Sequence, residues 1–95
     1  MILLTTVKPK FELGSVFATA NAIATFANEI LLACLNRHAA GDWGDLDPED
    51  RRANDSAVAS GGRVFSAYNI PESRRLWVIT EHDRSATTIL LPEDY

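Results

Sequence analysis

A pair of glycines, Gly41 and Gly44, sets the strongest limit on how this chain can fold. They lie within the segment His38–Leu46, H-A-A-G-D-W-G-D-L, directly after an apolar helical run. Glycine adopts backbone conformations that other residues resist, so the two positions predict a defined turn rather than a flexible connection. The chain therefore ends a helix at Gly41 and carries a histidine, two aspartates and a tryptophan into the turn that follows.

The residues before this turn predict helix from Thr19 to Ala40, with Thr19 as a plausible N-cap. Asn28 followed by Glu29 could start a second helix, so the segment is either one helix or two short helices with a bend. Large apolar residues recur at a spacing of three and four, which places one apolar stripe against a core. The stripe comprises Ile23, Phe26, Ala27, Ile30, Leu31, Cys34 and Leu35.

A second helix start is marked by Asp47-Pro48, where Asp47 caps the helix and Pro48 occupies its first turn. Acidic residues in that turn favour the positive end of the helix dipole. The segment carries few large apolar residues before Gly61-Gly62 ends it, which is typical of a surface helix.

The remaining chain predicts an antiparallel meander after a first short strand at Ser15–Ala18. The strand with apolar residues on both faces suits the centre of a sheet, with Trp77 in the core. The expected fold is α+β, with two or three short helices packed on an antiparallel sheet of three or four strands. We expect one domain, 1–95, in which residues 1–10 form an irregular arm. The expected segments are the strands 63–70, 75–81 and 86–91 and the turns 71–74 and 82–85.

The charge of the chain is concentrated in one place. The net charge is −4, and the segment Gly41–Asp55 holds six acidic and two basic residues, so it accounts for all of it. A basic stripe of the kind that binds nucleic acid is absent, so direct nucleic-acid binding is not expected. A lone cysteine, Cys34, fits a buried position and a cytoplasmic protein, and no apolar stretch is long enough to span a membrane.

Three motifs together resemble a family of small bacterial proteins carried on plasmids and integrative elements. They are R-H-x-x-G-D-W-G-D-L (Arg37–Leu46), G-x-R-V-F-S-A-Y (Gly61–Tyr68) and W-V-I-T-E-x-D-R-S-A-T-T-I-L-L-P-E-D-Y (Trp77–Tyr95). The resemblance runs from about Phe11 to Tyr95. It brings no assigned activity and no functional residues, and it implies an accessory gene of a mobile genetic element.

Some of the polar residues are of types that bind metal ions. His38, Asp42 and Asp45 are ligand types that divalent cations accept, but Gly41 breaks the helix between the first two. The consecutive residues 81–83, Glu-His-Asp, cannot all point inward from a turn. We therefore expect neither a metal nor another cofactor.

Acid–base chemistry on a phosphate is the alternative for the same region. His38, Glu81, Arg84 and Thr87 supply the side-chain types that small metal-independent nucleases use. Against this, the acidic segment disfavours the approach of RNA. His38 could equally be a cation at the C-terminal end of its helix, and His82 a solvated turn residue.

A binding role would use Asp42, Trp43, Asp45, Glu49 and Asp50. Trp43 is either a buried lid over the core or an exposed anchor for a partner, and the small size of the chain favours burial. Two polar clusters, His38–Leu46 and Thr80–Thr88, each follow an apolar element, and if they meet, Asp42 or Asp45 should form an ion pair with Arg84 or Arg63. Convergence of the side chains in one open pocket would favour an enzyme, and mutual pairing would favour a binding module.

These observations favour a non-enzymatic accessory protein, a protein-binding or regulatory module whose partner is another protein with a basic surface. The alternative is a small nuclease or other hydrolase built on His38, Glu81 and Arg84. A homodimer is expected because 95 residues can hardly cover the apolar helix stripe and both faces of the central strand. The contact would be a sheet edge or a helix face.

Overall fold

A computed structural model describes residues 8–71 and 74–95 of the protein. Residues 1–7, which hold most of the predicted N-terminal arm, lie outside the described residues, and so does part of the predicted turn 71–74. In order, the elements are β1 (Ser15–Ala18), α1 (Ala20–Thr25), α2 (Asn28–Ala39), α3 (Pro48–Ser60), β2 (Val64–Ile70), β3 (Arg74–Thr80), β4 (Ala86–Leu90) and the 3-10 helix η1 (Pro92–Asp94).

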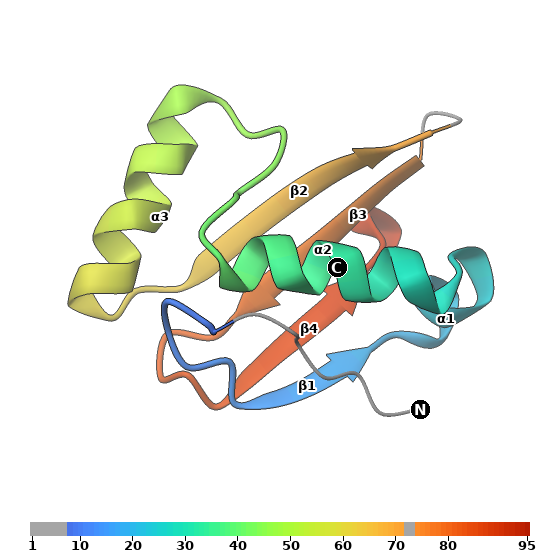
Figure 1. The fold of residues 1–95 in the computed structure, drawn as a ribbon, viewed down its shortest axis with the longest axis horizontal. Helices are drawn as coiled ribbons and strands as arrows, with labels where there is room; N and C mark the ends of the chain where they lie inside the picture. Colours follow the sequence, from blue (N-terminus) through green and yellow to red (C-terminus); the bar gives the residue numbers. More distant parts are fainter. Residues whose placement is uncertain (1–7, 72–73) are drawn as a thin grey trace.

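The four strands form one sheet in the order β1-β4-β3-β2, so the last strand lies inside it (Figure 1). β2, β3 and β4 are antiparallel neighbours, as predicted. β1 instead joins β4 in parallel, with Ser15 opposite Ala86 and Ala18 opposite Ile89. The α+β prediction is confirmed, but the sheet is mixed rather than purely antiparallel. A parallel pair needs a long crossover, and the helices and the first two hairpin strands provide it.

The helix boundaries follow the capping residues. Thr19 Oγ1 accepts a hydrogen bond from the Ala22 amide at 3.1 Å, which starts α1. The backbone becomes extended at Phe26 and α2 begins at Asn28, so the segment is two helices with a bend. Asp47 caps α3 by accepting from the Asp50 amide at 2.9 Å, and α3 ends at Gly61 in the left-handed conformation.

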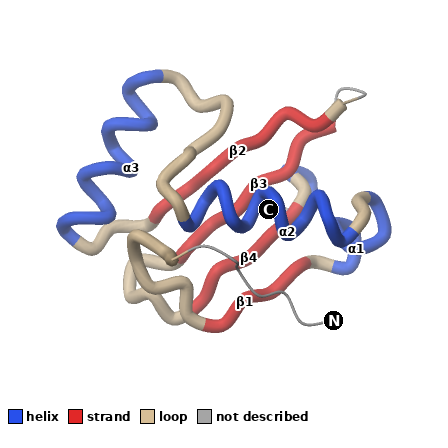
Figure 2. Tube along the Cα trace, viewed as in Figure 1, coloured by secondary structure: helices blue, strands red, loops and turns tan. Residues whose placement is uncertain are grey.

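The helices α1 and α2 pack on one face of the sheet, which we call the inner face (Figure 2). In β3 this face carries Leu76, Val78 and Thr80, all fully buried. Leu31 and Leu35 of α2 cover them and are themselves fully buried, and Phe26 and Cys34 of the predicted stripe join them in the core. Ile23 and Ala27 of that stripe are exposed, because the bend between α1 and α2 turns them away from the sheet. Cys34 is buried in the same cluster, and burial raises the pKa of its thiol to about 11.

The opposite face, which we call the outer face, carries Trp77 and Ile79 of β3, because successive side chains of a strand alternate. Trp77 is partly exposed there and packs edge-on against Phe65 and Tyr95, at 5.0 and 5.9 Å between ring centroids. The prediction that Trp77 belongs to the core is therefore wrong. Both faces of β3 are apolar because the strand is central, but only one of them lies beneath α2.

α3 lies beside the edge strand β2 rather than over the sheet (Figure 1). Most of its residues are exposed, as predicted from its composition, while Ala57 and Val58 pack against a small cluster that includes Trp43, Leu46 and Val64. In the described part of the chain, no helix has the length and apolar character needed to cross a membrane.

Candidate functional site

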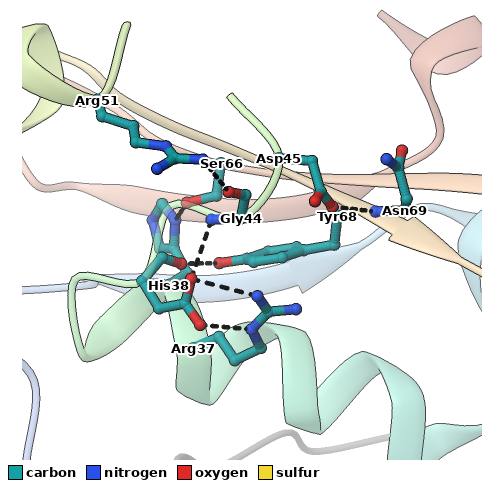
Figure 3. A network of polar contacts seen from close by, with 9 residues as sticks. Arg37, His38, Gly44, Asp45, Arg51, Ser66, Tyr68 and Asn69 are labelled. Atoms are coloured by element: carbon teal, nitrogen blue, oxygen red, sulfur yellow. Dashed lines mark hydrogen bonds and ion pairs between the residues drawn. The ribbon is translucent and has the colours of Figure 1, made fainter. Parts of the chain in front are cut away.

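The turn after α2 is fixed by an ion pair close to the helix. Arg37 donates to both carboxylate oxygens of Asp42, at 2.6 and 3.2 Å (Figure 3). The Asp42 carboxylate also accepts from the Gly44 amide at 3.1 Å. The hydrogen bond from Arg37 lowers the pKa of Asp42 below its ordinary value. Arg37 also lies over the ring of Tyr68, whose hydroxyl donates to the Asp42 carbonyl at 2.7 Å.

This pairing corrects one expectation. Neither Asp42 nor Asp45 forms an ion pair with Arg84 or Arg63; among the described residues the ion pair is that of Arg37 with Asp42. The reason is distance along the chain. Arg37 lies in the last turn of α2, only five residues before Asp42, so its side chain reaches the carboxylate just after the helix ends.

After Asp42, the turn caps the free edge of β2, which is the edge that is not paired with β3. The Ala67 amide donates to the Trp43 carbonyl at 3.3 Å, and the Asp45 amide donates to the Ala67 carbonyl at 2.7 Å. The Asn69 amide donates to the Asp45 carboxylate at 2.7 Å (Figure 3). Gly44 has φ +77, and a Cβ there would collide with the Ala67 carbonyl oxygen. Glycine at this position is therefore a requirement of the close backbone approach.

Asn54 of α3 completes the cap. Its side-chain amide donates to the Phe65 carbonyl at 2.6 Å and accepts from the Phe65 amide at 3.1 Å, as a neighbouring strand would. Together with Trp43 and Asp45, it satisfies alternate backbone groups along β2 from Phe65 to Asn69. The sequence analysis missed Asn54. The feature that could have indicated its role is that it is a polar residue among small ones, on the face of α3 that meets the sheet.

Trp43 is buried, with 6% of its surface exposed, as its place in a small chain predicted. Its indole N–H donates to the Asp55 carboxylate at 2.9 Å. Its ring packs against those of Phe11 and His38, at 6.0 and 5.8 Å between centroids. Trp43 therefore anchors the turn to the domain and does not project as a contact for a partner.

The carboxylates of the turn and of the first half of α3 are exposed, and we call this group of residues the acidic face. It comprises Asp42, Asp45, Asp47, Glu49, Asp50 and Asp55, all exposed. A polar cleft of about 310 Å³ lies within it, lined by Gly41, Asp42, Trp43, Gly44, Arg51 and Asp55. Arg51 donates to the carbonyls of Leu46 and Gly44, at 2.9 and 3.4 Å, so its positive charge is held at the margin of the turn.

His38 lies beneath this face and is fully buried. Its Nδ1 lies 2.5 Å from Ser66 Oγ, and its Nε2 lies 2.9 Å from Thr80 Oγ1. Thr80 Oγ1 in turn lies 2.7 Å from Thr87 Oγ1, and the Thr87 hydroxyl donates to the Leu13 carbonyl at 2.7 Å. We call this series the buried network.

The direction of the buried network follows from counting hydrogens. Because Thr87 gives its single hydrogen to Leu13, it accepts from Thr80, and Thr80 accepts from His38 Nε2. Nδ1 is then free of hydrogen and accepts from Ser66. The imidazole is neutral, since burial lowers the pKa of His38 to about 3 with a further contribution from the charge of Arg84. The cationic helix-end histidine considered from the sequence is therefore wrong.

Arg84 is used structurally. It has φ 60, and its guanidinium donates to the carbonyls of Gly62, Ala57 and Glu81, at 2.6, 2.8 and 3.2 Å. It thereby ties the β3–β4 turn to the C-terminal end of α3, where free carbonyls favour a cation. In the same turn Asp83 accepts from the Ser85 amide at 3.0 Å, and His82 is exposed.

The four candidate catalytic residues thus do not converge in an open pocket. His38 and Thr87 are fully buried and bonded to other hydroxyls or to backbone, Arg84 is bonded to three carbonyls, and Glu81 is partly exposed. Sequence reasoning missed Ser66 and Thr80 as partners of His38. Their signal was a small hydroxyl residue at an inward position of an otherwise apolar strand.

A metal site has no geometric support in residues 8–71 and 74–95, which contain no group of three histidine, cysteine or acidic side chains able to hold an ion. Comparison with known proteins adds no assignment: no family model, no curated protein and no solved structure matches this chain. The geometry of the acidic face and of the sheet therefore carries the functional argument.

Proposed function

We propose that this protein is a non-enzymatic protein-binding module and that the acidic face binds a basic surface on another protein. The supporting observation is that exposed carboxylates stand on a backbone held in place by hydrogen bonds. Asp42 is fixed by Arg37, and Asp45 by the Asn69 amide. Charges that are already in position lose little conformational freedom on binding, and they attract an oppositely charged partner from a distance.

The buried network supports a binding module over a nuclease. A general base must reach a proton on its substrate, and His38 has no exposed surface. Ser66 and His38 are side-chain types that form nucleophile–base pairs in hydrolases, but Ser66 is also fully buried. Both residues therefore contribute to the fold in this proposal.

The wider setting is part of the same proposal. The three sequence motifs favour an accessory protein of a mobile genetic element. The lone buried thiol, Cys34, fits the reducing cytoplasm. We further propose a homodimer, since a chain of 95 residues gains stability by covering exposed apolar surface with a second copy.

Capture from a host-cell lysate with two matched variants tests the acidic face. Glu49→Lys/Asp50→Lys reverses two exposed charges of α3 and leaves the cap residue Asp47 intact. Glu12→Lys/Glu29→Lys makes the same charge change elsewhere, and Glu29 likewise lies in the first turn of a helix. Each reversal at a helix start costs about 0.3–1 kcal/mol of stability, so both variants should fold.

The expected result is a partner that the wild-type and control proteins retain and the Glu49/Asp50 variant loses. Retention should also weaken with added salt, because the Debye length falls from about 10 Å at 0.1 M to about 3 Å at 1 M. A partner held equally by both variants contradicts the role of the acidic face. Cleavage of RNA by the purified protein that disappears in Glu81→Gln would support the nuclease instead.

A further inference from the structure

The outer face of the sheet is an apolar surface that the acidic face and the buried network leave unexplained. The strand registers place Phe17, Thr88, Ile79 and Phe65 in one row across all four strands. The adjacent row contains Leu90, Trp77 and Ala67. α1 and α2 pack on the other side of the sheet. η1 and Tyr95 meet these rows, and the β2 end of the rows packs with Trp43 and Leu46. Ile79, Leu90 and Ala67 are consequently buried, and the exposed surface belongs to the aromatic side chains.

Several large side chains of this face remain in solvent. Phe17 is 56% exposed and Tyr95 71% exposed, and Phe65 and Trp77 are partly exposed. A cleft of about 340 Å³ opens among Arg63, Phe65, Trp77, Ile79 and Tyr95. Contiguous exposed apolar surface on a small protein marks a contact surface more often than isolated apolar residues do.

The same face holds a hydrogen-bond donor that has no acceptor. Trp77 Nε1 is out of contact with solvent and has no partner in the described part of the chain. Buried donors in native proteins are almost always bonded, and an acceptor can reach this one only if the side chains around it move. Trp43, by contrast, gives its indole hydrogen to Asp55.

We propose that a second copy of the chain covers the outer face, so that the homodimer forms by packing sheet against sheet. This names the contact surface of the homodimer proposed above and rests on that proposal. A two-fold dimer brings one patch against itself, so the patch must not repel its own copy. Around the outer face Arg63 and Arg75 are balanced by Glu81 and Glu93, whereas the acidic face carries the net charge of the chain.

The position of the acidic face is compatible with this arrangement. α3 lies beside the capped edge of β2 and not over either face of the sheet (Figure 1). Two outer faces can therefore meet while each acidic face stays available to a different partner. Arg63 also lies over the ring of Tyr95, at 5.1 Å from its centroid, and is placed at the rim of the contact.

The size of the surface sets the expected affinity. Four strands about 4.8 Å apart and four to seven residues long make a small face, below the roughly 800 Å² per partner of a standard interface. We therefore expect a reversible dimer with a dissociation constant on the order of 10–100 µM, not an obligate one.

Sedimentation equilibrium over a range of protein concentrations tests the proposal with a matched pair of variants. Phe17→Glu places a charge in the outer row on β1. Ile23→Glu makes the same change at a residue of α1 that is 46% exposed and lies away from that row. Phe17→Glu should raise the dissociation constant at least about tenfold, while Ile23→Glu should leave it unchanged. Far-UV circular dichroism and the unfolding midpoint show that both variants are folded.

The outcomes separate the two proposals. A wild-type protein that stays monomeric at several hundred µM, beyond the expected constant, overturns both the homodimer and its surface. A dimer weakened equally by both variants, or by neither, keeps the homodimer and rejects the outer face. If the monomer instead binds an oligouridylate that quenches tryptophan emission in the wild type and not in Trp77→Phe, the face is a stacking surface for nucleic acid and the proposal is wrong.

Discussion

On the inner face of the sheet, imidazole and hydroxyl groups bond to one another, whereas on the outer face an indole N–H has no partner in the described residues. Both faces are crossed by the same strands, and both carry apolar side chains of β3. The centre of the inner face is buried beneath α2, so a polar group there must be hydrogen-bonded to offset its loss of hydration. On the outer face several aromatic rings remain partly exposed, while the Trp77 N–H is enclosed without a partner among the described residues.

This difference between the two faces indicates which residues are available for function. The residue types associated with catalysis, His38, Ser66 and Thr87, lie on the inner face and are fully buried. They contribute specificity to the core, because a network with every member paired allows few alternative packings. The surfaces proposed to bind partners consist of carboxylates on one side and aromatic rings on the other. Neither resembles a catalytic motif in sequence.

The largest effect is expected from removing the centre of the inner network. His38→Ala deletes a fully buried ring and leaves Ser66 and Thr80 without their partner. The cavity and the unpaired hydroxyls should together lower the free energy of unfolding by about 3–5 kcal/mol. Urea denaturation measures this loss. His82→Ala, at the exposed histidine, should change it by less than about 0.5 kcal/mol. A loss below 1 kcal/mol for His38→Ala would contradict the role of the network.

Protonation probes the same network without mutation. The pKa of His38 is about 3 in the folded protein and near 6.5 in the unfolded chain, so between these values the unfolded state binds more protons. The contribution of the neutral His38 ring to the free energy of unfolding is therefore fully present above about pH 6.5. It decreases as the pH drops, by up to about 1.4 kcal/mol per pH unit. Between pH 7 and pH 5 we expect a loss of about 2 kcal/mol. The pKa values of Asp42, Asp83 and Asp94 are lowered. Protonation of these carboxylates therefore changes the free energy of unfolding only at a pH below this range.

Urea denaturation at several pH values measures this slope, and His82→Gln should keep it. An NMR titration of the His38 ring gives an independent readout, in which its resonances should not move between pH 7 and 5. A stability that is constant over this range, or an imidazole that titrates near neutrality, would show that the ring is not held neutral by burial.

A smaller contrast is expected between the two tryptophans. Trp43→Phe removes a buried hydrogen bond to Asp55 and should cost about 2 kcal/mol. Trp77→Phe removes a donor that has no acceptor in residues 8–71 and 74–95, so the gain from losing an unpaired group offsets the lost packing. We expect a change within about 1 kcal/mol. The comparison is made by urea denaturation of dilute, monomeric protein. A greater cost at Trp77 than at Trp43 would mean that its N–H is paired within the monomer.

The local structure was largely predictable because its signals are local. Thr19 and Asp47 cap the helices that they were expected to cap, and Gly61 ends α3. The parallel pairing of β1 with β4 was not predictable, since it joins residues from opposite ends of the chain and leaves no periodic trace. Trp77 shows the same limit, because an alternating pattern separates two faces but does not say which one the helices cover.

The candidate site was less predictable than the fold. The exposed carboxylates follow from composition and helix position, and the burial of Trp43 follows from the size of the chain. The partners of His38 lie 28 and 42 residues away, on two strands whose facing sides depend on the completed sheet. Likewise, the ion pair was expected between the two polar clusters, yet Arg37 already reached Asp42 within the first of them.

The strand order has a consequence for biosynthesis. β1 has β4 as its neighbour in the sheet, so a nascent chain that has emerged only as far as β3 leaves β1 without its strand partner. The apolar sides of α1 and α2 likewise lack Ile89 and Leu91 to pack on until β4 has left the ribosome. Folding on the ribosome is therefore delayed until β4 has emerged. During that interval the front half of the protein depends on chaperones, or on rapid completion of synthesis, to avoid aggregation.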